Sequence, residues 1–398
     1  MQTASRTALR SLIDTLTEID ERWSGPEWNL HSEEDVAVSH RALMHILEAS
    51  MVGFFEQDAA RPDLRRITTP SRKLTGDNPD AVYFDAPLSA QYRYVLHGSM
   101  HGASYFSLTI EEGTAEGHMA SNSAGVINDT EMLVADDGSF TLYIGGEPRA
   151  RNWLSLTPDA SRLTTRHYFE HEQPAALDPA MEPRMRIECL DVQPPATSPT
   201  DASVASNITR VTNVLRSRTL EMPPLANSSP PPFVALTPNE FPAPIKPGDF
   251  GFAATDAHYS MAPFFLGPDQ ALIIRGRWPT CRFANLCLWN RFQQTLDYRS
   301  REVSINRAQT VTEKDGSFRL VVAHQNPGVA NWLDTEGQPF GLMFWRFFLA
   351  EGEVVTPTCE VVKLSEVLKK EARKCWRSEC TRSRAGWTAW VKDVEEIT

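Results

Sequence analysis

The strongest constraint on the fold is a segment that the chain contains twice. Asp137–Ile144 reads Asp-Gly-Ser-Phe-Thr-Leu-Tyr-Ile, and Asp315–Val322 reads Asp-Gly-Ser-Phe-Arg-Leu-Val-Val. An Asn-Trp-Leu triplet follows each copy, starting at Asn152 and at Asn331. Upstream, the motifs Asp-Ala-x-Tyr and Ala-Pro also recur at a nearly constant offset. These repeats indicate a duplicated structural unit with small insertions.

Both copies have the pattern of β-strands and turns. The Asp-Gly pairs predict tight turns, because both residue types tolerate the positive φ that such turns need. Apolar side chains then alternate toward one face in each copy, at Phe140, Leu142 and Ile144 and at Phe318, Leu320 and Val322. The segments 92–97 and 103–110 are predicted to be paired strands. We therefore expect an α+β protein with two tandem antiparallel β-sandwich units of jelly-roll type.

Length and composition agree with two units. The chain has 398 residues, which is enough for two domains with a core each. Its net charge of −12 argues against nucleic-acid binding, where a basic footprint is expected. No run of uncharged apolar residues is long enough to span a membrane, and no signal-peptide pattern begins the chain. The six cysteines form no CxxC pair, which favours reduced thiols in a cytoplasmic protein.

Helical periodicity and proline content divide the chain further. Residues 1–57 are predicted to form N-terminal helices, the second of them capped by Ser32. Residues 58–192 form unit one and residues 248–364 form unit two. Between them, residues 193–247 contain a helix and a segment with many prolines, which we expect to wrap around the units in an ordered way. Residues 365–398 are predicted to form a basic helix with three tryptophans.

Several stretches of unit one resemble a family without an assigned activity. They are Asp77–Tyr83, Tyr94–Gly98, Asp137–Phe140, Asn152–Leu154 and Arg166–Phe169. In this combination they resemble the mainly bacterial domain-of-unknown-function family twelve-fourteen, and unit two resembles it more weakly. The resemblance implies an antiparallel β-sandwich. It implies no catalytic residues, because the family has no established activity.

The repeat also separates scaffold from candidate site. Positions that match in both units, such as Arg166 with Arg346 and Trp153 with Trp332, are predicted to be structural. Unmatched polar positions are freer to serve a single site. Together with the polar residues next to them in the sequence, they point to catalytic roles for Asp80, Tyr83 and His97, and to ligand-binding roles for Asp77, Asn78, Arg93, His258 and Arg275. We expect Arg93 and His97 to lie near the sheet edge that carries Asp77.

Each of these sites has a simpler structural alternative. Asp77, Asn78 and Asp80 also fit an Asx-type turn in which Pro79 fixes φ. His97, His101 and His118, or His167 and His171, have ligand types suited to a metal but lack a diagnostic spacing. No phosphate-binding loop, dinucleotide fingerprint or nucleophile elbow is present, so we expect no cofactor.

Two function classes remain open from the residues alone. The first is an enzyme that acts on a small organic molecule, in a pocket of unit one or at the junction of the two units. The second is a non-catalytic module that binds carbohydrate or a protein partner, since one fold supports both roles. A homo-oligomer is compatible with either.

Overall fold

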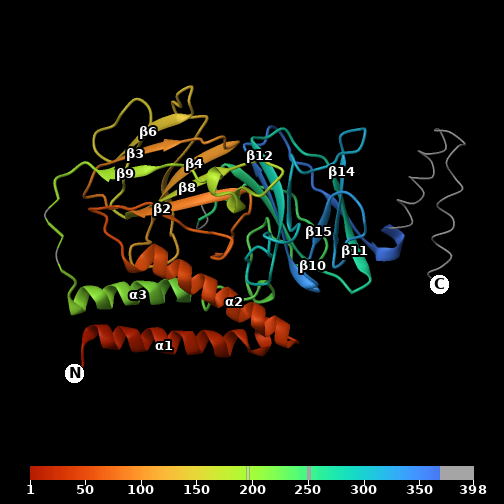
Figure 1. Ribbon diagram of the computed structural model, residues 1–398, viewed down its shortest axis with the longest axis horizontal. Coiled ribbons are helices and arrows are strands. Elements are labelled where there is room, and N and C mark those ends of the chain that lie inside the picture. Colours follow the sequence, from red (N-terminus) through yellow and green to blue (C-terminus); the bar gives the residue numbers. More distant parts are fainter. Residues whose placement is uncertain (194, 197, 249–251, 368–398) are drawn as a thin grey trace, which may run out of the picture.

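The computed structural model describes residues 1–193, 195–196, 198–248 and 252–367. Its strands form four sheets in two halves, with three long helices along one side (Figure 1). The predicted basic helix falls almost entirely after residue 367, so its lysines, arginines and tryptophans lie outside the described residues. No described helix is long and apolar enough to cross a membrane.

Unit one consists of two facing sheets. The first has the strand order β1-β2-β8-β4-β5, and the second has the order β7-β6-β3-β9. Side chains from both enclose one apolar core, which includes Leu108 and Leu163 from the first sheet and Leu96 and Leu142 from the second. The strands are β1 (Arg65–Arg66), β2 (Ala81–Pro87), β3 (Tyr94–Ser99), β4 (Tyr105–Glu112), β5 (Ser123–Asn128), β6 (Ser139–Ile144), β7 (Trp153–Leu154), β8 (Ala160–Tyr168) and β9 (Arg186–Cys189).

Unit two repeats this plan. Its sheets have the orders β10-β16-β12-β13 and β15-β14-β11-β17, and they enclose a second apolar core. The strands are β10 (Ala257–Phe265), β11 (Gln270–Gly276), β12 (Phe283–Trp289), β13 (Ser304–Asn306), β14 (Phe318–Ala323), β15 (Trp332–Asp334), β16 (Phe340–Phe348) and β17 (Thr358–Lys363).

The duplicated segments are scaffold in both units. Asn152 and Asn331 both adopt positive φ, and each side-chain amide donates to two backbone carbonyls of its own unit. The indoles of Trp153 and Trp332 each donate to a carbonyl at the end of a neighbouring strand. Gly138 and Gly316 have φ of 80° and 81°, which suits glycine in a tight turn. The prediction that these repeats are structural therefore agrees with their contacts.

The predicted pairing of residues 92–97 with 103–110 is wrong. β3 pairs with β6 and β9, whereas β4 pairs with β5 and β8 in the opposite sheet. The chain crosses from one sheet to the other through the turn at His101 and Gly102, both of which have positive φ. A strand pair and a crossover have the same alternation of residues, so the pattern could not distinguish them.

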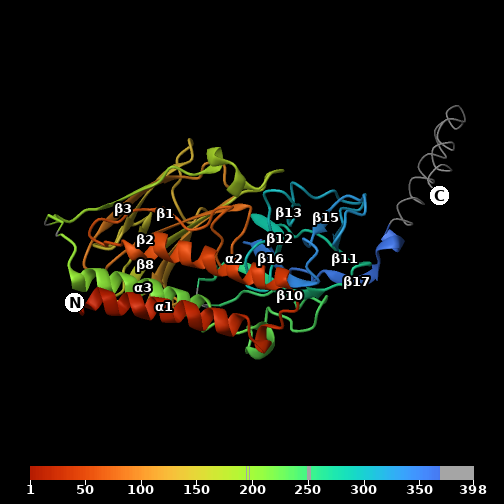
Figure 2. The same ribbon diagram turned by 60° about the horizontal axis from the view of Figure 1, so that its bottom comes forward.

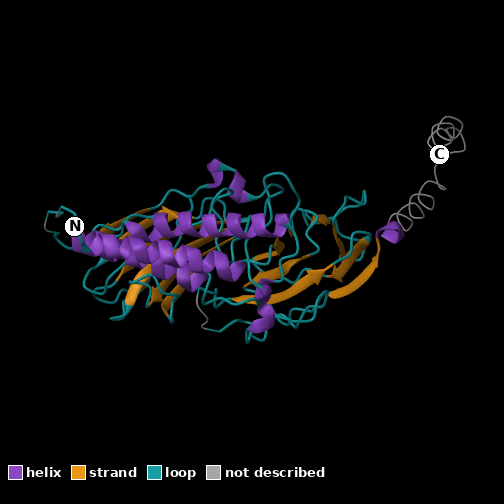
Figure 3. Ribbon diagram, turned by 90° about the horizontal axis from the view of Figure 1, so that it is seen from below, coloured by secondary structure: helices purple, strands orange, loops and turns teal. Residues whose placement is uncertain are grey.

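Three helices form one layer along the molecule. They are α1 (Ala4–Trp23), α2 (Glu33–Ser50) and α3 (Asp201–Arg218). Ser32 caps α2 as predicted, with the backbone N–H of Asp35 donating to its hydroxyl at 3.1 Å. α2 continues into the π-helical turn η2 (Met51–Phe55), and α3 packs against α1, α2 and η2 (Figures 2 and 3). The helix that precedes unit two thus lies with the N-terminal helices. The short helices are η1 (Pro26–Trp28), η3 (Ala175–Leu177), η4 (Pro179–Met181) and η5 (Leu225–Asn227).

The two units meet through the outer faces of the β2-β8-β4 and β10-β16-β12 strands. Aromatic side chains from both units fill this junction, including Tyr105 and Tyr168 from unit one and Phe283 and Phe348 from unit two. The proline-rich segment runs along β10, where Val234 and Ile245 form β-bridges with Met261 and Tyr259. The predicted ordered wrap is confirmed at these bridges.

Candidate functional site

Two cavities lie beside the junction, one on the outer face of each central sheet. The unit-one cavity, of about 130 Å³, is bounded by β2, β8, α2, η2 and α3. The unit-two cavity, of about 330 Å³, is bounded by β10, β16, the end of α3 and the proline-rich segment. They share Thr75, Gly76, Arg218 and Phe252 and are therefore neighbours across one wall. Only the unit-two cavity reaches the size range of ligand pockets.

The duplication places a tyrosine–arginine pair in each cavity. Tyr83 on β2 lies opposite Arg166 on β8, and both line the unit-one cavity. Tyr259 on β10 lies opposite Arg346 on β16, and both line the unit-two cavity. The arginines are only 4% and 3% exposed. A buried charge needs compensation, so the groups around each guanidinium decide what it can do.

Arg166 in unit one contacts a hydroxyl, a backbone carbonyl and a carboxylate. Its guanidinium donates to the Thr109 hydroxyl at 2.7 Å and to the Phe252 carbonyl at 2.9 Å. It also forms an ion pair with Glu111 at 3.4 Å. Burial raises the pKa of Glu111 although Arg166 acts in the opposite direction. The positive charge in the unit-one cavity is thus matched by a carboxylate of the same sheet.

Arg346 in unit two has no such carboxylate. Its guanidinium donates to the Gly76 carbonyl at 2.7 Å and to the Cys287 sulfur at 3.8 Å. It also lies over the rings of Phe344 and Trp289, at 4.3 and 5.1 Å from their centroids. Within the described part of the chain, no Asp or Glu forms an ion pair with it. Its charge is stabilised by these aromatic faces and, at longer range, by Asp77 and Asp80, because Arg346 acts to lower the pKa of both carboxyl groups.

The strand register shows which residues differ at equivalent positions of the two units. The pairing of β4 with β8 and of β12 with β16 aligns Thr109 with Cys287 and Glu111 with Trp289. The carboxylate that neutralises the unit-one arginine is therefore an indole in unit two.

A second charged pair of the unit-one cavity has been exchanged as well. Arg162 and Asp85 form a buried ion pair in unit one. The same register places Leu342 and Met261 at the corresponding positions of unit two. The larger cavity has lost charged pairs and gained apolar surface.

Arg218 adds a second guanidinium to the unit-two cavity. It donates to the Thr75 hydroxyl at 3.2 Å and lies over the Phe252 ring at 4.6 Å. No ion pair joins it to a described carboxylate, and burial lowers its pKa to about 10. Arg346 contacts Gly76, whose Cα lies about 3.8 Å from that of Thr75. The two guanidiniums therefore converge on one short segment.

The remaining lining of this cavity is mostly apolar. Among its described lining residues there is no aspartate or glutamate, and the charged ones are Arg218 and Arg346. Four aromatic side chains pack against one another along its wall: Phe233, Tyr259, Trp289 and Phe344. Burial raises the pKa of Tyr259 to about 12, so its hydroxyl stays protonated near neutral pH. The arrangement suits an organic anion with an apolar body.

Comparisons with known proteins support the duplication. The family described as "Protein of unknown function (DUF1214)" matches residues 83–172 and again residues 274–351. The chain carries two tandem copies of this domain. Each matched region includes one of the paired arginines.

A solved structure shares the architecture of the two DUF1214 units. The crystal structure of an uncharacterized protein from Burkholderia cenocepacia is 26% identical, with a TM-score of 0.75. The match covers 90% of this chain and 97% of that protein. A protein from Vibrio parahaemolyticus is more distant, at 13% identity and a TM-score of 0.47 over 81% of this chain and 98% of that one. No curated protein matches the sequence.

The cluster predicted around Asp80 braces the two DUF1214 units against each other. Asn285 of unit two donates to Asp80 and to Asn78, both at 2.8 Å. The Thr295 backbone N–H donates to Asp77 at 2.8 Å. Asn78 also accepts from the backbone of Asp80, which is the Asx-type turn proposed as the structural alternative.

Burial also changes the protonation of this cluster. It raises the pKa of Asp80 to about 7, while hydrogen bonds from Asn285 and Asn306 act in the opposite direction. Both Asp80 and Asn78 are nearly inaccessible to solvent, at 0% and 2% exposed. Neither lines either cavity, whereas Asp77 and Tyr83 line the unit-one cavity.

The other predicted site residues lie apart. His97 on β3 is exposed in the second sheet of unit one, where it contacts Thr141, and Arg93 pairs with Asp191 beside it. Arg275 is exposed on β11 and pairs with Glu360. The expectation that Arg93 and His97 share a sheet edge with Asp77 is wrong, because β3 and β2 belong to opposite sheets.

His258 and the other histidines occupy separate places as well. His258 on β10 is half-buried and lines neither cavity. His167 is buried and contacts the Ser99 carbonyl, and His101 contacts the Ala180 carbonyl. Within the described residues, no group of three or more His, Cys, Asp or Glu side chains is placed to hold a metal ion.

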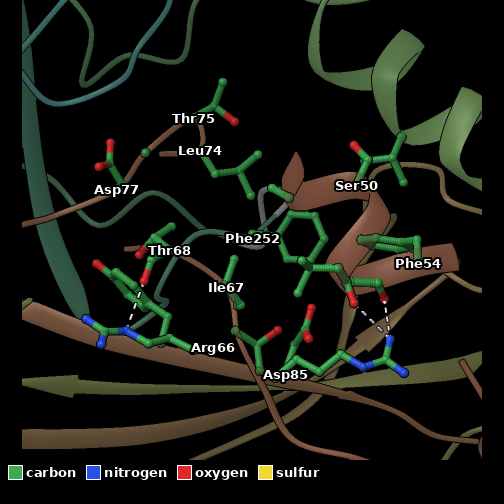
Figure 4. A pocket seen from close by; sticks show the side chains of 18 of the residues that line it. Ser50, Phe54, Arg66, Ile67, Thr68, Leu74, Thr75, Asp77, Asp85 and Phe252 are labelled. Carbon is green, nitrogen blue, oxygen red and sulfur yellow. Dashed lines mark hydrogen bonds between the residues drawn. The ribbon is translucent and has the colours of Figure 1, made fainter. Parts of the chain in front are cut away.

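Figure 4 shows the side chains that line the unit-one cavity. The Phe252 ring lies between Leu74 and Phe54, above Ile67, and Asp85 lies at the base. Sequence reasoning did not select Phe252, Arg218 or Trp289, and it assigned Arg346 to the scaffold. The available signal was the exchange of Glu111 for Trp289 between aligned copies.

Proposed function

We propose that the protein binds a small organic acid in the unit-two cavity, at the junction of the two units. The carboxylate lies between Arg346 and Arg218, and the apolar body lies against the aromatic wall. The observation that supports this most directly is a buried guanidinium without a carboxylate partner, in a cavity of about 330 Å³. Guanidinium groups match the planar geometry of carboxylates and can bind them through two hydrogen bonds.

The proposal favours binding over proton-transfer catalysis. The titratable groups that line the cavity, in the described part of the chain, are Arg218, Arg346 and Tyr259. Tyr259 keeps its proton at neutral pH because burial raises its pKa to about 12. A general acid or base works best with a pKa near the operating pH. The lining therefore supports a ligand-binding protein more than an enzyme.

A ligand screen with matched variants tests the proposal. A panel of aromatic and aliphatic carboxylic acids, their neutral alcohols and simple sugars should be compared by thermal shift. Acids should raise the melting temperature, because a ligand of the native state stabilises it. Arg346→Met should weaken acid binding roughly 10- to 100-fold, since hydrogen bonds to charged groups contribute about 1.5–3 kcal/mol.

The control is Arg275→Met, which removes an exposed arginine of the same unit that lies outside the cavity. It should leave acid binding unchanged. If alcohols bind as tightly as acids, or if Arg346→Met binds acids like the unchanged protein, the assignment of the carboxylate site is wrong. Binding of sugars alone would favour a carbohydrate-binding module.

We also propose three broader properties of the protein. The facing sheets around one core in each unit support a β-sandwich of jelly-roll type. The four cysteines among the described residues are free thiols, which supports a reducing, cytoplasmic setting. The similarity to a Burkholderia protein supports a bacterial source for this protein.

A further inference from the structure

Phe252 stands where the two cavities meet. It lines both of them, and its ring projects toward the middle of the unit-one cavity (Figure 4). Two arginines hold it there. Arg166 donates to its backbone carbonyl at 2.9 Å, and Arg218 lies over its ring at 4.6 Å. Arg166, which pairs with Glu111 in unit one, therefore also helps to position a wall of the unit-two cavity.

The unit-one cavity, into which this ring projects, is lined by both apolar and charged side chains. The side chains of Val52, Phe54, Ile67 and Leu74 line it, and the Arg162 guanidinium is paired with Asp85. An apolar chain that entered this space would be removed from water without separating an ion pair. Phe252, together with Thr75, Gly76 and Arg218, lies at the boundary between this space and the unit-two cavity.

We infer that Phe252 sets the maximum length of the acid that the protein binds. The inference rests on the proposed function and specifies its ligand class as monocarboxylic acids with an unbranched or ring-bearing apolar body that fits within the unit-two cavity. Longer acids are rejected because the ring blocks the unit-one cavity. Phe252 is thus a specificity-determining residue that contacts the apolar part of the ligand.

A chain-length series tests this inference. Straight-chain acids from six to sixteen carbons should be titrated calorimetrically, each below its micellar concentration, against the unchanged protein and Phe252→Ala. With the unchanged protein, each added methylene should tighten binding up to about fourfold until the cavity is full. Beyond that length, affinity should level off or fall, and we call this chain length the break. In Phe252→Ala the break should occur at a chain several methylenes longer. Acids longer than the original break should bind this variant at least tenfold more tightly than the unchanged protein.

Two further variants keep the result interpretable. Phe252→Leu retains an apolar side chain and should move the break by a smaller amount, even if the alanine variant is too unstable to titrate. Phe265→Ala removes a phenylalanine that is 60% exposed and should leave the series unchanged.

The outcomes distinguish this inference from the proposed function. Equal weakening at every length, with the break unmoved, would show that Phe252 acts only by supporting Arg218, and the inference would be overturned. If the unchanged protein binds none of the acids, the proposed function itself fails, and the inference fails with it. A break that moves in Phe252→Ala and Phe252→Leu but not in Phe265→Ala supports both.

Discussion

The two halves of the molecule place an arginine at the same position and surround it differently. In unit one, Arg166 faces Glu111 and a hydroxyl, and its charge is matched within the sheet. In unit two, Arg346 faces an indole and a thiol, and no described carboxylate pairs with it. Desolvating a charge without a partner is unfavourable, so such an arrangement needs compensation from elsewhere. A ligand anion would supply it.

The difference also explains the sizes of the cavities. Unit one keeps its space narrow with long, mutually paired side chains such as Arg162 and Asp85. In unit two these positions are apolar, and the proline-rich segment forms the outer wall of a larger space. Duplication thus produced one unit that braces the molecule and one that has room for a ligand.

Removing each arginine in turn tests whether the two units differ in this way, and the larger effect on stability is expected in unit one. Arg166→Met should lower the free energy of unfolding by about 3–5 kcal/mol, because it leaves Glu111 buried without its cation. The loss should be smaller at acid pH, where Glu111 takes up a proton. Urea unfolding at two pH values measures both. An effect below 1 kcal/mol would contradict the view that this ion pair is a structural unit.

A second prediction concerns the brace between the units. The pKa of Asp80 is raised to about 7 in the folded protein, so the folded state holds a proton that the unfolded state releases above about pH 4. Stability from this group is therefore lost as pH rises toward 7. Asp80→Asn should remove this dependence. The difference in unfolding free energy between the variant and the unchanged protein should therefore change by about 2–3 kcal/mol between pH 5 and pH 8. Parallel unfolding curves across that range would show that Asp80 is ionised throughout.

The counterpart in unit two should have a small effect on stability. Arg346→Met loses the bond to Gly76 but also removes a buried charge, and these contributions oppose each other. We expect a change within about 1 kcal/mol together with the loss of acid binding. Thermal unfolding with and without an acid ligand separates the two effects. A loss of stability as large as that of Arg166→Met would mean that both arginines are scaffold.

The smallest expected effect comes from exchanging one partner atom. Cys287→Thr gives Arg346 the hydroxyl partner that Thr109 gives Arg166. Stability should change by less than about 1 kcal/mol, the scale of a single hydrogen bond. Acid affinity should fall slightly, because the hydroxyl competes for the guanidinium. Calorimetric titration against Cys281→Thr, a cysteine outside both cavities, provides the control.

The candidate site could be predicted only in outline. Comparing the copies directed attention to their differences and to the junction. It also placed Arg346 in the scaffold, because the arginine itself is the same in both copies. The informative exchange, Glu111 for Trp289, lies on another strand, and its contact with the arginine depends on a register that sequence alone does not give. Arg218 and Phe252 could not be selected, since both lie outside the repeated regions.

The sequence by itself determined the duplication, the alternating apolar faces and the turns, because these follow from local backbone preferences and side-chain periodicity. It also determined that α2 begins after Ser32. The tertiary structure decided that β3 and β4 lie in opposite sheets, that α3 joins the N-terminal helices, and that the two arginines have different partners. Those features depend on contacts between residues far apart in the chain. A buried charge must be compensated by the groups next to it, so the neighbours of each arginine determine whether it serves the scaffold or a ligand site.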